Sequence, residues 1–156
     1  MSKAGPDHRR DDKLARLLAA IPYAGFLGVR FDRAGDELTA VMPFRADLIG
    51  NPMLPALHGG ATSGFLEVAA LVELMWSVLW EEEGGAAPEA PLVLPKTIDF
   101  TIDYLRSGQP RDSFARARVA RSGRRYANVH VEAWQERRDR PHAQARGHFL
   151  LPGRDD

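Results

Sequence analysis

No cysteine occurs among the 156 residues of the chain. Its absence excludes disulfide bonds, thiolate metal sites and cysteine nucleophiles, and it is typical of proteins from a reducing compartment. An excess of charge is also lacking, because 21 basic residues balance 21 acidic ones. We therefore expect no general attraction to nucleic acid or to an anionic membrane.

A long uninterrupted apolar run is missing as well. Residues 1–12 are polar and charged, and the longest apolar stretch is interrupted by Glu67 and Glu73. Secretory signals and membrane spans both need such a run. We expect a cytoplasmic protein with neither a membrane nor a nucleic-acid partner.

With 44% apolar residues, the chain can bury one core but is too short for two ordinary domains. We expect residues 1–24 to form a tail and a short helix, with the tail reaching residue 12 and the helix spanning 10–20 before Pro22 stops it. Residues 25–151 would form the domain, and residues 152–156 a C-terminal tail.

The pattern of apolar residues predicts an α+β fold. Two strands within 28–44 flank a turn at Gly35, and residues 45–57 form a loop. Residues 61–80 form a helix that is apolar on nearly all sides and must be wrapped by other elements. An exposed loop is expected at 84–91. Alternating patterns at 97–104, 115–119, 127–133 and 143–149 then predict four half-buried strands, which we expect to pair as an antiparallel meander curled around the helix.

The candidate catalytic residues lie where the loop at 45–57 enters the helix. His58, Gly59 and Gly60 stand at the helix start, and Glu67 follows two turns later among apolar neighbours. Free N–H groups and the helix dipole at such a start can stabilise an oxyanion. A carboxylate in apolar surroundings is paired, reaches water, or works in catalysis.

These residues resemble the PaaI-type hot-dog thioesterases. The resemblance rests on the His-Gly-Gly triplet with an acid nine positions after the histidine, on Asn51-Pro52 before it, and on the strand at 98–106. It implies a hot-dog fold, an antiparallel sheet wrapped around a central helix. It also implies hydrolysis of an acyl- or arylacyl-CoA thioester without a metal or other cofactor, by a homodimer or homotetramer whose active site lies between subunits.

The resemblance also implies residue roles. Glu67 would act as general base or nucleophile, and the Gly59 N–H would polarise the thioester carbonyl. Asn51 would orient water or the carboxylate across the interface, and His58 would be a positioning residue. The sequence departs from the family in two places: the acid is most often aspartate, and Asn51 stands one residue further from the histidine than usual.

Arginines dominate the second half of the chain. Eleven arginines face four acids between residues 106 and 146, an excess of seven positive charges in a neutral protein. Arginine clusters suit phosphate groups, which the CoA nucleotide carries. With the backbone of Gly60, we expect Arg106, Arg121, Arg124 and Arg125 to contact the substrate.

Other interpretations stay open. Glu67 could be satisfied by a neighbouring arginine or backbone group, and Asn51 could be an ordinary turn residue. The same fold could serve a non-catalytic acyl-CoA or lipid-binding module, or a hot-dog dehydratase or hydratase. His130 and Glu132 share a strand face without a third metal ligand, so no metal site is expected.

Overall fold

The computed structural model describes residues 6–81 and 92–153, and its N-terminal part is helical. Helix α1 (Pro6–Ala19) is followed by the short helix α2 (Pro22–Leu27). The predicted tail is wrong for residues 6–12, which belong to α1. Ion pairs join this part of the helix to the hairpin formed by the first two strands: Arg33 Nε lies 2.9 Å from Asp11 Oδ1, and Arg10 pairs with Asp36 in the turn. Pro22 does separate two helices, as proline at a first helical position should.

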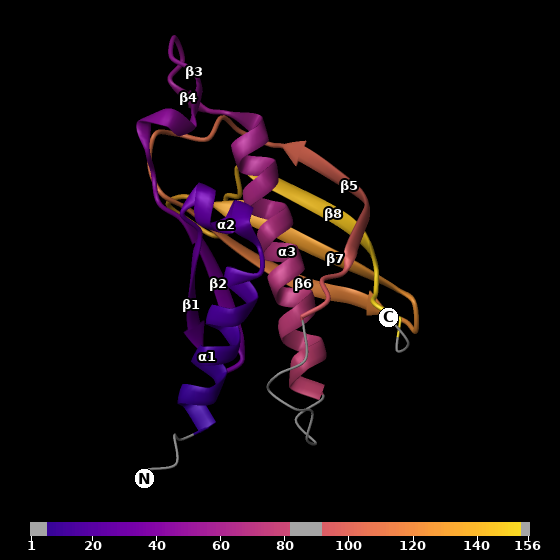
Figure 1. Ribbon diagram of the computed structural model, residues 1–156. Coiled ribbons are helices and arrows are strands. Elements are labelled where there is room, and N and C mark those ends of the chain that lie inside the picture. Colours follow the sequence, from indigo (N-terminus) through magenta and orange to yellow (C-terminus); the bar gives the residue numbers. More distant parts are fainter. Residues whose placement is uncertain (1–5, 82–91, 154–156) are drawn as a thin grey trace.

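Six antiparallel strands form the main sheet (Figure 1). They are β1 (Arg30–Ala34), β2 (Glu37–Met42), β5 (Lys96–Tyr104), β6 (Ser113–Ser122), β7 (Tyr126–Trp134) and β8 (Ala143–Leu150). As predicted, the β1–β2 turn uses Gly35, at φ 64°. The segment expected as a loop instead holds a 3-10 turn, η1 (Ala46–Leu48), and a small hairpin of β3 (Ile49–Asn51) and β4 (Ala56–Leu57).

The predicted four-strand meander is wrong in one position. The strand order is β1-β2-β6-β7-β8-β5, so β6, β7 and β8 form a meander while β5 pairs with β8 at the sheet edge. Alternation along a strand reports which face is buried but not which strand lies beside it. The register of β5 also shifts between Thr97 and Asp99. On this edge strand Ile98 and Tyr104, expected to be half buried, are 53% and 56% exposed.

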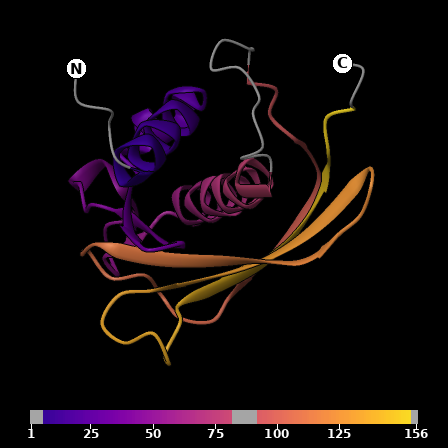
Figure 2. The ribbon, with the colours of Figure 1, turned by 90° about the horizontal axis from the view of Figure 1, so that it is seen from below.

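Helix α3 (Gly59–Glu81) lies across the concave face of the sheet (Figure 2). Phe65, Leu66 and Val72 are fully buried in one core with residues from both sides. Small strand residues such as Ala115 and Ala145 let the helix approach the sheet, while Leu17 of α1 covers the other side. The prediction that this helix must be wrapped is confirmed. The loop predicted at 84–91 lies outside the described residues.

In the described part of the chain, no helix is long and apolar enough to cross a membrane.

Candidate active site

The entry to α3 is fixed by hydrogen bonds from both sides. The His58 N–H donates to Leu48 O at 2.8 Å, and the Leu57 N–H donates to Gly108 O at 2.9 Å. His58 then caps the helix with its side chain, since its Nδ1 accepts the Gly60 N–H at 2.8 Å. The imidazole therefore stabilises the start of α3.

The backbone N–H groups of Gly59 and Gly60, at the start of α3, differ in whether they already donate a hydrogen bond. The N–H of Gly60 already donates to His58 Nδ1, so it is not a free donor. A Cβ on Gly60 would lie 2.8 Å from His58 Nδ1, which explains the glycine. The Gly59 N–H has no acceptor in residues 6–81 and 92–153. It is a free donor at the positive end of a 23-residue helix.

Tyr104 fixes the opposite side of Gly59. Its hydroxyl donates to Gly59 O at 2.8 Å, and a Cβ on Gly59 would lie 3.2 Å from the tyrosine ring. The end of the edge strand β5 is thus attached to the start of α3. The half-buried backbone of Gly59 and the exposed edge of the sheet consequently occupy one region of the molecule.

Glu67 is half buried, and its carboxylate accepts a hydrogen bond from a residue that the sequence analysis did not identify. The Thr97 hydroxyl, from the start of β5, donates to Glu67 Oε1 at 2.6 Å. Among the described residues no arginine pairs with Glu67, so the alternative of an acid neutralised by arginine is not supported. Thr97 could not be found from spacing, because only the pairing of β5 at the sheet edge brings it to the helix.

The free N–H and the carboxylate lie far apart within one chain. Glu67 follows Gly59 by eight residues, which is about 12 Å along a helix at about 1.5 Å per residue. A single thioester carbonyl cannot contact both groups of the same helix.

Asn51 lies at the end of β3 and is exposed. Its Oδ1 accepts the Met53 N–H at 3.0 Å, an arrangement typical of an Asx turn. The turn role left open by the sequence is therefore observed in the single chain. Met53, which the turn presents, is 89% exposed.

The predicted phosphate-binding arginines fall into two groups. Arg106 lies just after the end of β5, beside the start of α3. This is the end of the sheet at which Tyr104 of β5 pairs with Ala143, the first residue of β8. Arg121, Arg124 and Arg125 lie in or beside the β6–β7 hairpin, next to the other end of β8 at Leu150. One chain does not bring the four side chains together.

Glu73 is a second carboxylate on α3, and its environment is different. Burial raises the pKa of Glu73 to about 7, against the attraction of Arg116, which lowers it. Arg116 is itself held by Glu37 and Thr39, both at 3.0 Å. Glu37, Glu73 and Arg116 line a cavity of about 630 Å³, whose lining includes neither Gly59 nor Glu67. Glu73 is therefore remote from the helix start.

The strand face that carries His130 and Glu132 is occupied by arginine contacts. His130 Nδ1 lies 3.2 Å from a guanidinium nitrogen of Arg118, and Glu132 pairs with Arg138 at 3.1 Å. Within residues 6–81 and 92–153, no three His, Asp or Glu side chains are arranged to hold a metal ion.

Both the sequence and the fold of this chain are similar to those of known proteins. Residues 50–150 match the profile of a family described as acyl-CoA thioesterase N-terminal domain. The Escherichia coli K12 protein named medium/long-chain acyl-CoA thioesterase YigI is 31% identical over 120 residues, covering 74% of this chain and 77% of that protein.

Solved structures extend the likeness to the fold. A protein from Chromobacterium violaceum is 39% identical and superimposes with a TM-score of 0.65, covering 92% of this chain and 93% of that one. A protein from Bacillus halodurans, crystallised with CoA, is 19% identical with a TM-score of 0.63, covering 98% and 99%. The expected α+β hot-dog fold is confirmed.

Proposed function

The chain belongs to the acyl-CoA thioesterase family and is a thioester hydrolase, and on this premise we propose that it hydrolyses acyl-CoA thioesters with Glu67 as the catalytic carboxylate. The observation that carries the proposal is that one helix presents two groups: a free N–H at Gly59, and the Glu67 carboxylate, which Thr97 holds by a hydrogen bond. The name of the Escherichia coli relative supports a medium or long aliphatic acyl group.

The active site would lie between two copies of the chain. Among the residues that the structure describes, no strand pairs with the outer edge of β5, and this strand carries the exposed apolar side chains Ile98 and Tyr104. Such an edge favours pairing with another strand. A two-fold axis would pair β5 with β5 antiparallel, so that the Gly59 end of one copy meets the Thr97 end of the other. Gly59 of one chain and Glu67 of a second chain would then face one thioester.

This arrangement also brings the two arginine groups closer. The β6–β7 hairpin lies at the same end of the sheet as the start of β5. In the proposed dimer, the hairpin arginines of one copy approach Arg106 of the other. The expected homodimer would use this interface, and a homotetramer would need a second interface between two such dimers.

In the proposed hydrolysis of the thioester, each of the site residues has one role. The Gly59 N–H, at the positive end of the helix dipole, donates to the thioester carbonyl oxygen and stabilises the oxyanion that forms. Glu67 accepts a proton from a water molecule whose oxygen attacks the carbonyl carbon. The C–S bond then breaks, the thiolate of CoA takes up the proton, and the free acid remains. The Thr97 hydroxyl holds the carboxylate in place, and Asn51 would orient the water from the interface.

A nucleophilic Glu67 uses the same geometry. Its carboxylate would attack the carbonyl carbon directly, CoA would leave, and water would hydrolyse the resulting anhydride. Both routes need an unprotonated carboxylate and the Gly59 donor.

Thiol release from a panel of acyl-CoA and arylacyl-CoA thioesters tests the proposal. Wild type should turn over at least one substrate, and Glu67→Gln should lose about a hundredfold or more, as expected when a catalytic acid-base group is removed. Glu73→Gln on the same helix is the matched control and should keep its turnover. If acyl-CoA binds but wild type releases no thiol, the chain is a binding module. Enoyl product without thiol release would indicate a dehydratase.

A further inference from the structure

A second cavity, of about 300 Å³, lies between two loops at one end of the sheet. One loop, residues 105–112, joins β5 to β6, and the other, residues 135–142, joins β7 to β8. Four arginines line this cavity against a single acid, Glu136. They are Arg106, Arg111, Arg137 and Arg140. Of these, the sequence had suggested Arg106 alone as a ligand contact.

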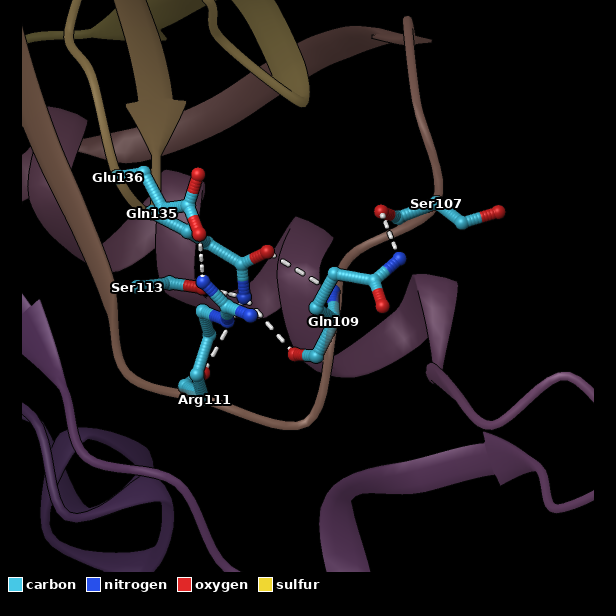
Figure 3. A network of polar contacts seen from close by, with 6 residues as sticks. All are labelled: Ser107, Gln109, Arg111, Ser113, Gln135 and Glu136. Carbon is cyan, nitrogen blue, oxygen red and sulfur yellow. Dashed lines mark hydrogen bonds and ion pairs between the residues drawn. The ribbon is translucent and has the colours of Figure 1, made fainter.

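The walls of the cavity are braced by the side chain of Gln135 (Figure 3). Its Nε2 donates to Gln109 O at 2.9 Å and to Arg111 O at 3.2 Å, and its Oε1 accepts the Gln109 N–H at 2.8 Å. On the other side, the N–H groups of Leu105 and Arg106 both donate to His142 O, at 2.9 and 3.1 Å. The cavity is therefore formed before any ligand arrives, which reduces the entropic cost of binding.

Two of the four arginines are neutralised by acids and two are not. Arg111 pairs with Glu136, and Arg137 donates to Asp139 at 2.9 Å. Arg106 donates to the neutral carbonyl of Pro141 at 2.7 Å. In the described part of the chain, neither Arg106 nor Arg140 has an acidic partner.

The uncompensated arginines come from opposite loops, Arg106 from the first and Arg140 from the second. Two guanidinium groups that line one cavity can bind the oxygens of a single phosphate, each through two N–H groups. The excess of positive charge within a preformed cavity selects an anion over a neutral ligand.

The cavity lies beside the candidate active site. Gly108, in the first loop, accepts the Leu57 N–H at 2.9 Å, and Gly59 follows two residues later. A phosphate in the cavity would thus be held near the helix start at which the thioester carbonyl is proposed to bind.

We propose that this cavity binds a phosphate group, and that in turnover the phosphate belongs to the nucleotide end of the acyl-CoA substrate. The second part rests on the proposed function. The first part concerns phosphate chemistry alone, and it can be tested without turnover.

Calorimetric titration with adenosine 3′,5′-bisphosphate tests the site itself, on the full chain. Arg140→Ala and Arg106→Gln should each weaken binding by roughly tenfold or more, since a charge-assisted contact is lost. Glu136→Gln should tighten binding several-fold, because it removes the lining acid and releases Arg111. Arg30→Ala, at an exposed arginine on β1, is the control and should bind as wild type does. Absence of binding to wild type, or equal weakening by Arg30→Ala, overturns the site.

A comparison of two substrates identifies the source of the phosphate. For Arg140→Ala, KM should rise about tenfold with acyl-CoA and stay unchanged with the corresponding acyl-pantetheine, which carries no nucleotide, while kcat is unchanged with both. An unchanged KM with acyl-CoA, together with lost bisphosphate binding, overturns the CoA assignment and leaves a phosphate site for a separate compound. Failure of thioester hydrolysis would not affect the titration, so the two proposals fail independently.

Discussion

Two inactive variants of this chain should restore activity when they assemble together. Glu67→Gln removes the proposed carboxylate, and Gly59→Pro removes the proposed oxyanion donor. Proline is tolerated at the first position of a helix, where no intrahelical N–H bond is lost. The added ring approaches Tyr104, but that side chain is 56% exposed and has room to shift.

The expected size of the recovery follows from the helix geometry. A carbonyl oxygen bound to the Gly59 N–H lies about 3 Å from the nitrogen. Glu67 begins about 12 Å further along the helix, and its side chain reaches only a few Å back toward the helix start. In the proposed dimer each site therefore takes its two groups from different chains, and each variant alone should lose about a hundredfold or more.

A heterodimer of the two variants then contains one site with both defects and one intact site. Its activity should be about half that of wild type, and an equal mixture of freely exchanging chains should reach about a quarter, because half of its dimers are heterodimers. If each site used one chain only, every site would carry one defect and nothing would be regained.

The assay is thiol release by heterodimers isolated with two different affinity tags. Heterodimers of wild type with each variant are the controls, and they show that each altered chain folds and assembles. Activity no greater than that of the separate variants, in heterodimers that are demonstrably formed, would refute the division of the site.

Three further changes test individual contacts. Thr97→Val should lower kcat about tenfold with KM nearly unchanged, and Thr97→Ser should restore it, because the hydroxyl only positions Glu67; steady-state kinetics checks this. His58→Ala should cost about 1 kcal/mol of unfolding free energy in urea, while His58→Asn should keep most of it, since asparagine also caps helices. The pKa of Glu73 is raised from 4.5 to about 7 in the folded state, so the free energy of unfolding falls as the pH rises from 4.5 to about 7 and the buried side chain ionises. Glu73→Gln should therefore stabilise the protein by about 1–3 kcal/mol at about pH 8 and have little effect at about pH 4, and an equal effect at both would contradict the reasoning.

Much of the fold could be predicted because it depends on local patterns. The helix predicted at 61–80 spans Gly59–Glu81, and the four alternating segments are all strands. The burial of Phe65 and Val72 follows from an apolar helix that has no polar face. Such patterns are properties of consecutive residues, since the direction of each side chain is set by its own backbone.

The failures of prediction concern contacts between distant residues. Within α1, Arg10 and Asp11 form ion pairs with the β1–β2 hairpin. Ile98 is exposed on β5, at the edge of the sheet. Neither the ion pairs nor the strand order leaves a pattern in the neighbouring sequence.

The candidate site divides in the same way. The sequence by itself determined that His58, Gly59 and Gly60 start a helix and that Glu67 lies two turns further on, because helix geometry fixes these distances. The residue order did not show that the His58 side chain takes the N–H of Gly60, two positions later, which leaves Gly59 as the free donor.

The partner of Glu67 was likewise decided only in three dimensions. Thr97 stands 30 residues from Glu67 along the chain, and it reaches the carboxylate because β5 pairs with β8 and not with β6. Strand pairing is a competition among all strands of the molecule for hydrogen-bonding partners, and the residues within any one strand do not encode its outcome.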